Sequence, residues 1–595
     1  MATRAAHDPR IEDYALIGDL QTSAHVGADG SIDWLCLPDF DSPACFAALV
    51  GDHDNGHWRI APDGAGRCTR RRYHDHSMIL ETEWEVDGGR VRVTDFMPVR
   101  EKLPNLIRIV EGLEGRVDMV SAVRFRFDYG HVVPWLRHPD GHVVAVAGPD
   151  LVMMRTGVDL ESEDYATTAR FTVGQGDRVP FVMAWRPSHR DEPDAIDPDD
   201  ALHRTKKFWH TWLEHNSYDG PYFDAVRRSL LVLKSLTYAP TGGIVAAPTA
   251  SLPEDLGGER NWDYRFCWLR DATFTLQAFL GCGYREEAES WRHWLLRAAA
   301  GDPADLQPMY TVAGARRMLE WTVPWLAGFG DSTPVRVGNG AAGQFQLDVW
   351  GEVLGGLSLA RDNGIKDGEP TWHMQIALAE HLAEHWSEPD DGLWEMRGER
   401  QHFVHSKVLA WVGMNAAARG ARDRGEDERA SAWQAVADTI HDEVCEKGFD
   451  AERNTFTQYY GSSELDAATL LMAKVGFLPG DDPRLVGTVD AVREELGSDG
   501  FVRRYSTSSG EDGVQGGEGT FLACSFWMVE ALVVTGRLDE ARRSFESLLD
   551  VRNDVGLLAE EWDVDGERQL GNFPQAYSHV GLVNAALAIR DAEAR

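Results

Sequence analysis

Short runs of alternating apolar and polar residues mark the first third of the chain. Residues 82–86 and 90–94 alternate in this way, and Asp87-Gly88-Gly89 between them is a turn signal, so together they predict a β-hairpin. Many short strands separated by Gly, Asp and Pro turns are typical of an antiparallel β-sandwich, which we expect over residues 1–200. Further strands are predicted at 143–147, 151–154 and 169–173.

The hydrophobic period changes to that of α-helices near residue 221. Before the change, residues 191–200 form an acidic stretch that contains proline, and we interpret 201–220 as a linker. Residues 221–595 are then expected to form a second, all-α domain. Its predicted helices lie at 222–238, 271–281, 285–300, 345–361, 370–386, 404–420, 425–447, 464–475, 483–496, 519–536, 538–550 and 573–592.

The connections between these helices alternate in length. Links from even to odd helices are short, as at Cys282-Gly283-Tyr284, whereas links from odd to even helices are long. Short links join antiparallel neighbours, so in an up-and-down arrangement every long loop emerges at the same end. Six such helical hairpins predict an (α/α)6 barrel with its functional site at that rim. The long loops span 239–270, 301–344, 387–403, 448–463, 497–518 and 551–572.

Composition limits the partners of the chain. Its 595 residues exceed what one hydrophobic core organises, in agreement with two domains. Lys and Arg number 59 against 96 Asp and Glu, which gives a net charge of −37. Nucleic acids and anionic membranes bind to basic patches, so neither is expected as a partner. A small neutral or cationic ligand suits this charge better.

Cysteine usage and the N-terminus favour a cytoplasmic protein. Seven cysteines are scattered without a Cys-x-x-Cys pair, which indicates free thiols rather than a disulfide framework. Residues 1–7 lack the apolar core of a signal peptide, and no apolar run is long enough to span a bilayer. His381-Leu382-Ala383-Glu384-His385 matches a zinc-peptidase pattern but lies on an amphipathic helix without a third ligand. We expect neither a metal nor a cofactor.

Two glutamates fall in predicted rim loops among apolar residues. Glu395 lies in Leu393-Trp394-Glu395-Met396, and Glu560 lies in Leu557-Leu558-Ala559-Glu560-Glu561-Trp562. A single loop glutamate is usually a solvated side chain. Two that face each other across a pocket, however, supply what glycoside hydrolysis needs, because one protonates the leaving oxygen and the other activates water. The pair therefore predicts a glycoside hydrolase.

The first long loop combines aromatic and charged residues. It ends in Asn261-Trp262-Asp263-Tyr264-Arg265-Phe266-Cys267-Trp268-Leu269-Arg270-Asp271. Aromatic rings stack on the C–H faces of a sugar, while Arg270 and Asp271 can hydrogen-bond to its hydroxyl groups. The alternative is that Asp271 only caps the next helix and that Arg270 is its ion-pair partner.

Other carboxylates compete for the role of the acid. Asp348 and Glu352 lie four residues apart on one face of a predicted helix. Glu352 is a rival acid, whereas Asp348 is interpreted as a support for the pocket. Glu518, among glycines at the end of the fifth long loop, is a further alternative.

Over nearly its whole length, the chain resembles glycoside hydrolase family fifteen, which includes glucoamylases, isomaltose glucohydrolases and microbial trehalases. Residues 264–271 resemble the family motif Tyr-x-x-x-Trp-x-Arg-Asp, whose Arg and Asp hold the non-reducing glucose. Trp394-Glu395 resembles the Trp-Glu of the general acid, and Ala559-Glu560-Glu561 resembles the Pro-Glu-Gln of the general base. Residues 11–19 and 30–36 resemble the β-sandwich of the bacterial and archaeal branch.

The resemblance implies an inverting, exo-acting α-glucoside hydrolase that releases β-glucose from a small-molecule substrate. Tyr264 resembles the tyrosine that helps to hold the attacking water, and Arg504-Tyr505 resembles an Arg-Tyr pair whose Arg contacts the glucose. The predicted substrate-binding residues are Trp268, Arg270, Asp271, Asp348, Trp394, Arg397, Arg504, Tyr505 and Glu561.

One departure from the family pattern bears on the substrate. Glucoamylases carry a second Glu after the acid, where this chain has Met396. Residues 394–399 and 571–576 look more like the trehalase-like members, so we expect α,α-trehalose as the substrate. The alternatives are an α-1,4- or α-1,6-glucosidase, a disaccharide phosphorylase in which phosphate replaces the second carboxylate, and a sugar-binding protein without catalysis. We also expect the stretch from Asp19 to Asp33 to reach the rim.

Overall fold

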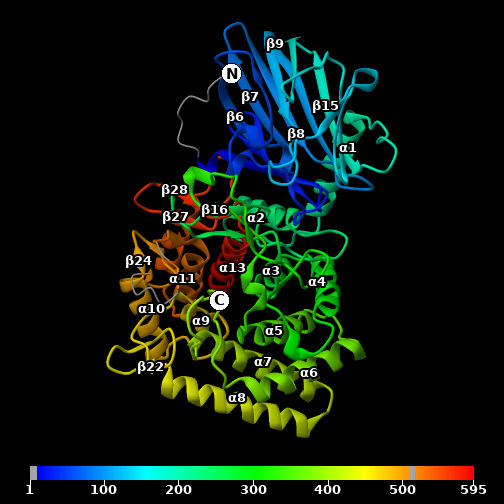
Figure 1. Ribbon diagram of the computed structural model, residues 1–595. Helices are drawn as coiled ribbons and strands as arrows, with labels where there is room; N and C mark the ends of the chain where they lie inside the picture. Colours follow the sequence, from blue (N-terminus) through cyan, green and yellow to red (C-terminus); the bar gives the residue numbers. More distant parts are fainter. Residues whose placement is uncertain (1–9, 508–512, 515) are drawn as a thin grey trace.

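The protein has two parts, a sheet domain at one end and a helical domain at the other (Figure 1). This computed structural model describes residues 10–507, 513–514 and 516–595. Residues 1–7, which lack a signal-peptide core, lie outside the described residues.

The sheet domain consists of antiparallel strands in one 15-stranded sheet. The predicted hairpin is formed by β7 and β8, and the other predicted strands correspond to β11, β12 and β14. The strands are β1 (Tyr14–Gly18), β2 (Ser23–Gly27), β3 (Ser31–Cys36), β4 (Ala44–Phe46), β5 (His57–Pro62), β6 (Arg67–Tyr73), β7 (Leu80–Val86), β8 (Gly89–Phe96), β9 (Asn105–Arg124), β10 (Trp135–Arg137), β11 (Val143–Ala147), β12 (Asp150–Thr156), β13 (Glu161–Glu163), β14 (Ala166–Gly174) and β15 (Arg178–Pro187).

Strand β9 is the centre of this sheet. Its N-terminal half pairs with β8 and β15, and its C-terminal half pairs with β5 and β14. The two halves of the sheet face each other, since Trp58 of β5 packs edge-on against Phe181 of β15 with ring centroids 6.4 Å apart. Buried apolar side chains from alternate strand positions fill the space between the halves, as expected for a sandwich.

Residues that we interpreted as a linker are mostly helical. Helix α1 (Pro198–Leu213) begins after Asp197, whose side chain accepts hydrogen bonds from the backbone N–H groups of Asp199 and Asp200. The sequence Asp-Pro at this point is a helix start signal, because Asp is a good N-cap and Pro suits the first helical position. We overlooked this helix start signal because the acidic composition of residues 191–200 is also typical of a linker.

Helix α1 connects the two parts of the protein. Near its start, Ala201 packs with Ile79 and Phe96 of the sheet domain. Near its end, the Trp212 ring stacks on Tyr284 of the helical domain with ring centroids 4.1 Å apart, and its indole N–H donates to Glu287. The connection between the domains is therefore a packed helix.

All the predicted helices of the second domain are present. They are α2 (Phe223–Ser235), α3 (Leu269–Gly281), α4 (Arg285–Ala298), α5 (Asp348–Asp362), α6 (Glu369–His385), α7 (Val404–Asp423), α8 (Asp427–Lys447), α9 (Leu471–Lys474), α10 (Pro483–Glu495), α11 (Leu522–Val534), α12 (Leu538–Asp550) and α13 (Ala576–Glu593). Helix α9 is shorter than predicted, because a 3-10 turn at Ala467–Leu470 precedes it and Gly476, with φ of 68°, follows it.

Six of these helices form a closed inner ring. Helix α3 packs on α5, and the contacts continue through α7, α9, α11 and α13 back to α3. The remaining helices lie outside this ring, so the predicted (α/α)6 barrel is confirmed. The helices of the inner ring and those outside it differ in composition. Helix α11 is apolar on all sides and almost entirely buried, whereas the outer helix α12 buries only Ala541, Phe545 and Leu548.

The first and last long loops lie beside the sheet domain. In Figure 1 their short strands β16 (Ala250–Pro253), β27 (Glu561–Asp563) and β28 (Arg568–Leu570) lie at the junction of the two domains. The short strands of the fourth and fifth long loops, β22 (Phe449–Asp450) and β24 (Gly497–Ser498), lie away from the sheet domain (Figure 1). Among the described residues, no helix is both long and apolar enough to cross a membrane.

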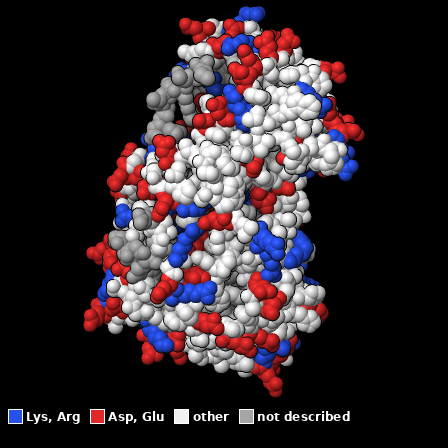
Figure 2. All heavy atoms as spheres, in the orientation of Figure 1, with Lys and Arg blue, Asp and Glu red and all other residues white. Residues whose placement is uncertain are grey.

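Charged side chains are mixed over the surface. On the face drawn in Figure 2, acidic groups are spread over both domains, with basic groups dispersed among them.

Candidate active site

A cavity of about 290 Å³ opens at the rim of the helical ring. Every long loop except 448–463 contributes to its wall, and no described residue of the sheet domain does. The stretch from Asp19 to Asp33 lies behind the rim, where His25 hydrogen-bonds to the carbonyl oxygen of Phe573. The lining residues are Ala246, Arg260, Trp262, Tyr264, Trp268, Arg270, Asp271, Asn339, Gly340, Ala341, Gln344, Leu393, Trp394, Glu395, Met396, Arg397, Arg504, Tyr505, Val514, Phe521, Glu560, Gln575 and Tyr577.

Most of the predicted site residues therefore meet in one cavity. Glu395 and Glu560, from loops 165 residues apart in sequence (560 − 395), line the same cavity. Asp348 and Glu561 are the two predicted residues that do not contribute to its wall. Both are buried behind residues that do.

Glu395 is held in a specific orientation at one side of the cavity. Its Oε1 accepts a hydrogen bond of 2.6 Å from the indole Nε1 of Trp268. Its backbone φ is 61°, a left-handed conformation that is unfavourable for a residue with a Cβ and that is often found at functional sites. Burial raises the pKa of Glu395, and the nearby Arg270 guanidinium opposes that rise. A raised pKa suits a group that must donate a proton.

Glu560 is buried more deeply than Glu395 and is only 1% exposed. Its Oε2 accepts a hydrogen bond from the backbone N–H of Asn572, while its Oε1 has no hydrogen-bond partner among the described residues. Gly571 makes this position possible, because a Cβ there would lie 2.5 Å from Oε2. Burial and the negative charge of Glu254 raise the pKa of Glu560 to about 8.

Arg504 is surrounded by carboxylates beside Glu560. Its Nη2 lies 2.6 Å from both Glu254 and Glu518 and 3.5 Å from Glu561. These three carboxylates lie close enough to one another to hold a metal ion, but the Arg504 guanidinium contacts all of them. A cation is therefore already supplied by the chain, and the geometry gives no reason to invoke a metal.

Arg270 and Asp271 form a buried ion pair in the cavity wall. Arg270 Nε donates to Asp271 at 3.1 Å, and Arg270 Nη1 donates to the carbonyl oxygen of Leu393 at 2.9 Å. Arg270 thereby joins the first loop to the loop that carries Glu395. Asp271 lies in the first turn of α3 but is not its cap, since the N-cap is Trp268. The capping interpretation is wrong, whereas the ion pair that it included is present.

Two aromatic pairs support the floor of the cavity. Tyr264 and Trp268 meet edge to face with ring centroids 5.3 Å apart. Burial and the charge of Glu560 raise the pKa of Tyr264 far above its usual range, so its hydroxyl group stays protonated and can donate. Trp394 donates its indole N–H to Asp466 at 2.9 Å and lies 6.5 Å from the Tyr505 ring.

Beside the acid, Trp262 and the predicted residue Arg397 line the cavity and contact two residues, Arg336 and Glu320, that the sequence did not reveal. The ring of Trp262 lies 4.6 Å from the Arg336 guanidinium and 4.4 Å from that of Arg397. Glu320 forms an ion pair with Arg397 at 2.9 Å. Arg336 and Glu320 come from the second long loop, which carries no recognisable motif, so only the fold could reveal them. Arg397 presents guanidinium N–H donors beside the acid.

The rival carboxyls on α5 lie outside the cavity. Asp348 and Glu352 are buried below Arg270 and are absent from the cavity wall. Burial, followed by the charge of Asp348, raises the pKa of Glu352 to about 8. Glu352 is therefore out of reach of a sugar bound in the cavity. Glu518, the other alternative, pairs with Arg504 and also does not line the cavity.

Comparisons with known proteins cover both domains. The model described as glycosyl hydrolases family 15 matches residues 220–587, and the one described as trehalase-like, N-terminal, matches residues 3–209. A trehalase of Mycobacterium tuberculosis is 36% identical over 98% of this chain and 90% of its own. A trehalase of Thermoplasma volcanium is 33% identical over 98% and 94%, respectively.

Among solved structures, a bacterial glucoamylase complexed with acarbose has the same fold. It superimposes with a TM-score of 0.73 at 12% identity and covers 99% of this chain and 94% of that chain. The match extends over both the sheet domain and the helical domain, so it confirms the predicted fold class.

Replacing Glu352 with Gln is expected to stabilise the protein at alkaline pH. The pKa of Glu352 rises from 4.5 to about 8 on folding, so the folded protein keeps a proton that the unfolded chain releases. The buried Glu352 carboxyl therefore lowers the free energy of unfolding of the parent protein. This destabilisation is absent below pH 4.5 and grows as the pH rises to about 8. We expect the variant to melt at least about 2 °C above the parent protein at pH 8, with a smaller difference at pH 5. Thermal melts at both pH values measure this.

The matched control is Glu380→Gln, which changes an exposed side chain of helix α6. Its effect on melting should be the same at both pH values. An equal change for Glu352→Gln at pH 5 and pH 8 would contradict the assigned burial of a protonated carboxyl.

Proposed function

The chain belongs to glycosyl hydrolases family 15, and we propose that it hydrolyses α,α-trehalose by an inverting mechanism. The observation that carries the proposal is that Glu395 and Glu560, from separate loops, line one cavity with the Arg270–Asp271 pair. Inverting glycosidases place an acid and a base on opposite sides of the bond, roughly 6.5–9.5 Å apart, with water between base and sugar.

We assign Glu395 as the general acid and Glu560 as the general base. The indole N–H of Trp268 orients Glu395 toward the glycosidic oxygen, and the raised pKa of Glu395 keeps its proton available. The free Oε1 of Glu560 can accept a proton from water, while the Tyr264 hydroxyl helps to hold that water. The base must be ionised to act, so its ionised fraction grows as the pH approaches its pKa of about 8.

The bound glucose would lie against the charged wall of the cavity. Arg270 and Asp271 can hydrogen-bond to its hydroxyl groups, and Arg504 adds a guanidinium from the opposite loop. Trp268 and Trp394 offer ring faces or edges at the same depth. These contacts would tighten as the sugar flattens in the transition state.

Trehalose is supported as the substrate by three observations. The relatives that match almost the full length are named trehalases. Met396 stands in the cavity wall where glucoamylases carry a second Glu, and it packs with Phe403 and Tyr505. The guanidinium group of Arg397, which lines the cavity, can hydrogen-bond to the hydroxyl groups of a second glucose. An α-1,4- or α-1,6-glucosidase would accept a longer chain at this side.

Two further features complete the proposal. We propose residues 1–200 and 221–595 as the two domains, with α1 as the packed connection between them. We also propose a cytoplasmic location, which the free state of all seven cysteines supports.

The phosphorylase and binding-protein alternatives fit this cavity less well. A phosphorylase would bind phosphate where Glu560 lies, but Glu254, Glu518 and Glu561 surround that position with negative charge. A binding protein without catalysis would have no need for a glutamate held in a left-handed conformation, as at Glu395.

Glu395→Gln and Glu560→Gln should each lower kcat by about 10²–10⁴-fold, because each variant removes one proton-transfer group. Both should fold normally, since neither carboxyl contributes to an apolar core. Glu352→Gln is the matched control, because it changes a buried carboxyl close to the cavity but outside its wall. Steady-state kinetics on trehalose measure all three. A loss for Glu352→Gln as large as that for Glu395→Gln would contradict the assignment of the acid.

The anomers released from trehalose distinguish inversion from retention. Direct attack by water inverts the cleaved centre and gives β-glucose, while the leaving glucose keeps its α configuration. Proton NMR at early times, before mutarotation, should therefore show α- and β-glucose in equal amounts. A retaining enzyme would release only α-glucose, and that outcome would exclude the assigned roles.

The substrate preference is tested with trehalose, maltose, isomaltose, kojibiose and soluble starch. We expect the highest kcat/KM for trehalose, because the outer side of the cavity offers polar donors for one further glucose. A tenfold preference for maltose or isomaltose, about 1.4 kcal/mol in transition-state binding, would overturn the choice of substrate and leave the catalytic pair unaffected.

A further inference from the structure

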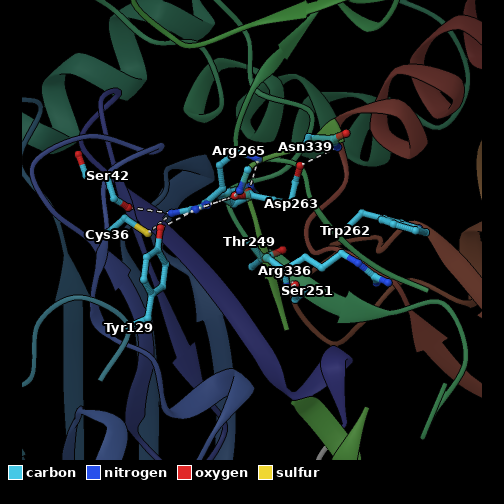
Figure 3. Close-up of polar contacts among 12 residues, drawn as sticks. Cys36, Ser42, Tyr129, Thr249, Ser251, Trp262, Asp263, Arg265, Arg336 and Asn339 are labelled. Carbon is cyan, nitrogen blue, oxygen red and sulfur yellow. Dashed lines mark hydrogen bonds and ion pairs between the residues drawn. The ribbon is translucent and has the colours of Figure 1, made fainter. Parts of the chain in front are cut away.

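Arg265 joins the sheet domain to the cavity. It follows Tyr264 in the sequence and is completely buried, at 0% exposure. Figure 3 shows its side chain extending from the first long loop toward Cys36, Ser42 and Tyr129 of the sheet domain. Nη1 donates to the carbonyl oxygen of Ser42 at 2.7 Å, and Nη2 donates to the hydroxyl oxygen of Tyr129 at 2.8 Å.

The other edge of the Arg265 guanidinium binds Asp263. Nε and Nη2 donate to the two carboxylate oxygens of Asp263 at 2.9 and 2.7 Å, which is a two-pronged contact. Both side chains are fully buried. Asp263 and Arg265, which flank Tyr264, are therefore bound to each other, and Arg265 is also bound to the sheet domain.

Asp263 carries the connection further, to the second long loop. Its Oδ2 accepts a hydrogen bond of 2.9 Å from the backbone N–H of Gly338, and its carbonyl oxygen accepts one of 3.2 Å from Asn339 Nδ2. Asn339 lies in the cavity wall together with the neighbouring residues Gly340 and Ala341. One ion pair thus fixes three segments, namely two cavity loops and the sheet domain (Figure 3).

Disturbing this ion pair would move the cavity wall. A buried guanidinium that loses an acceptor keeps the full cost of its desolvation, so it shifts to find another partner. A shift of Arg265 would also move Tyr264, because the two residues are adjacent in the chain. Displacements of about 1 Å at a reacting group cost up to about 10²-fold in rate.

We propose that Arg265 is a positioning residue for the hydrolysis, through which the sheet domain sets the position of Tyr264 in the cavity. The proposal rests on the function proposed above, because it assigns Tyr264 to the water side of the reaction. It gives the sheet domain a part in turnover, although that domain contributes no described residue to the cavity wall.

Tyr129→Phe tests the proposal with a minimal change. It removes the hydroxyl group that accepts from Arg265 and keeps the ring that meets Trp321 edge to face. We expect kcat to fall about tenfold, which corresponds to about 1.4 kcal/mol. The matched control is Tyr73→Phe, which removes a buried tyrosine hydroxyl of the same domain that bonds only to the backbone of Leu16. It should lower the melting temperature as much and leave kcat unchanged.

A double-mutant cycle separates positioning from general stability. If Arg265 acts through Tyr264, Tyr129→Phe should have no further effect on kcat in a Tyr264→Phe background. Arg265→Lys, which keeps the charge but cannot form the two-pronged contact, should show the same coupling if the variant folds. A Tyr129→Phe enzyme with unchanged kcat, or fully additive effects with Tyr264→Phe, would overturn the inference.

The kinetics use the α-glucoside that the parent enzyme hydrolyses fastest. A parent enzyme that hydrolyses none of the five sugars tested above would refute the proposed function. An active parent enzyme with an unaffected Tyr129→Phe variant would refute only the role of Arg265.

Discussion

The balance of buried charge around Arg504 is the interaction on which the candidate site depends. One guanidinium contacts Glu254, Glu518 and Glu561, with Glu560 beside them, and Arg260 adds a second cation 3.7 Å from Glu518. Burial and the neighbouring carboxylates raise the pKa values of Glu254, Glu560 and Glu561, and Arg504 opposes that rise. Burial is the main cause of the raised pKa of both proposed catalytic carboxyls; Glu254 adds to it at Glu560, whereas Arg270 opposes it at Glu395.

The closed ring of inner helices explains why these charges can be held so close together. Helices α3, α5, α7, α9, α11 and α13 pack in a circle, so their connecting loops begin and end at fixed points around the cavity. Arg270, at the end of the first long loop, is then bound to the Leu393 carbonyl of the third long loop. The sheet domain closes the arrangement from outside through Arg265.

The sequence predicts the architecture well, because periodicity and loop length follow directly from packing. The helices of the ring and the β7–β8 hairpin are where the pattern indicates. Glu395, Glu560 and Arg270 are identifiable from the composition of the loops in which they lie, and Arg504 from its resemblance to the Arg-Tyr pair of the family. Helix α1 was missed because local acidity resembled a linker, although Asp197-Pro198 is a capping signal.

The contacts that were missed join residues far apart in the chain. Trp262 meets Arg336 and Arg397, and Arg265 meets Ser42 and Tyr129, across separations that no local pattern encodes. The same limit applies to Glu254, whose charge acts on Glu560 only because β16 returns beside the last loop. Short motifs therefore reveal the reacting groups, whereas the groups that orient them are visible only in the fold.

Helix α1 has a consequence for how the chain folds. Ala201 packs in a small cluster of the sheet domain, whereas Trp212 belongs to the main cluster, which extends through both domains. A sheet domain or a helical ring made alone would expose an apolar face that α1 covers. Docking of this one helix therefore buries apolar surface of both architectures.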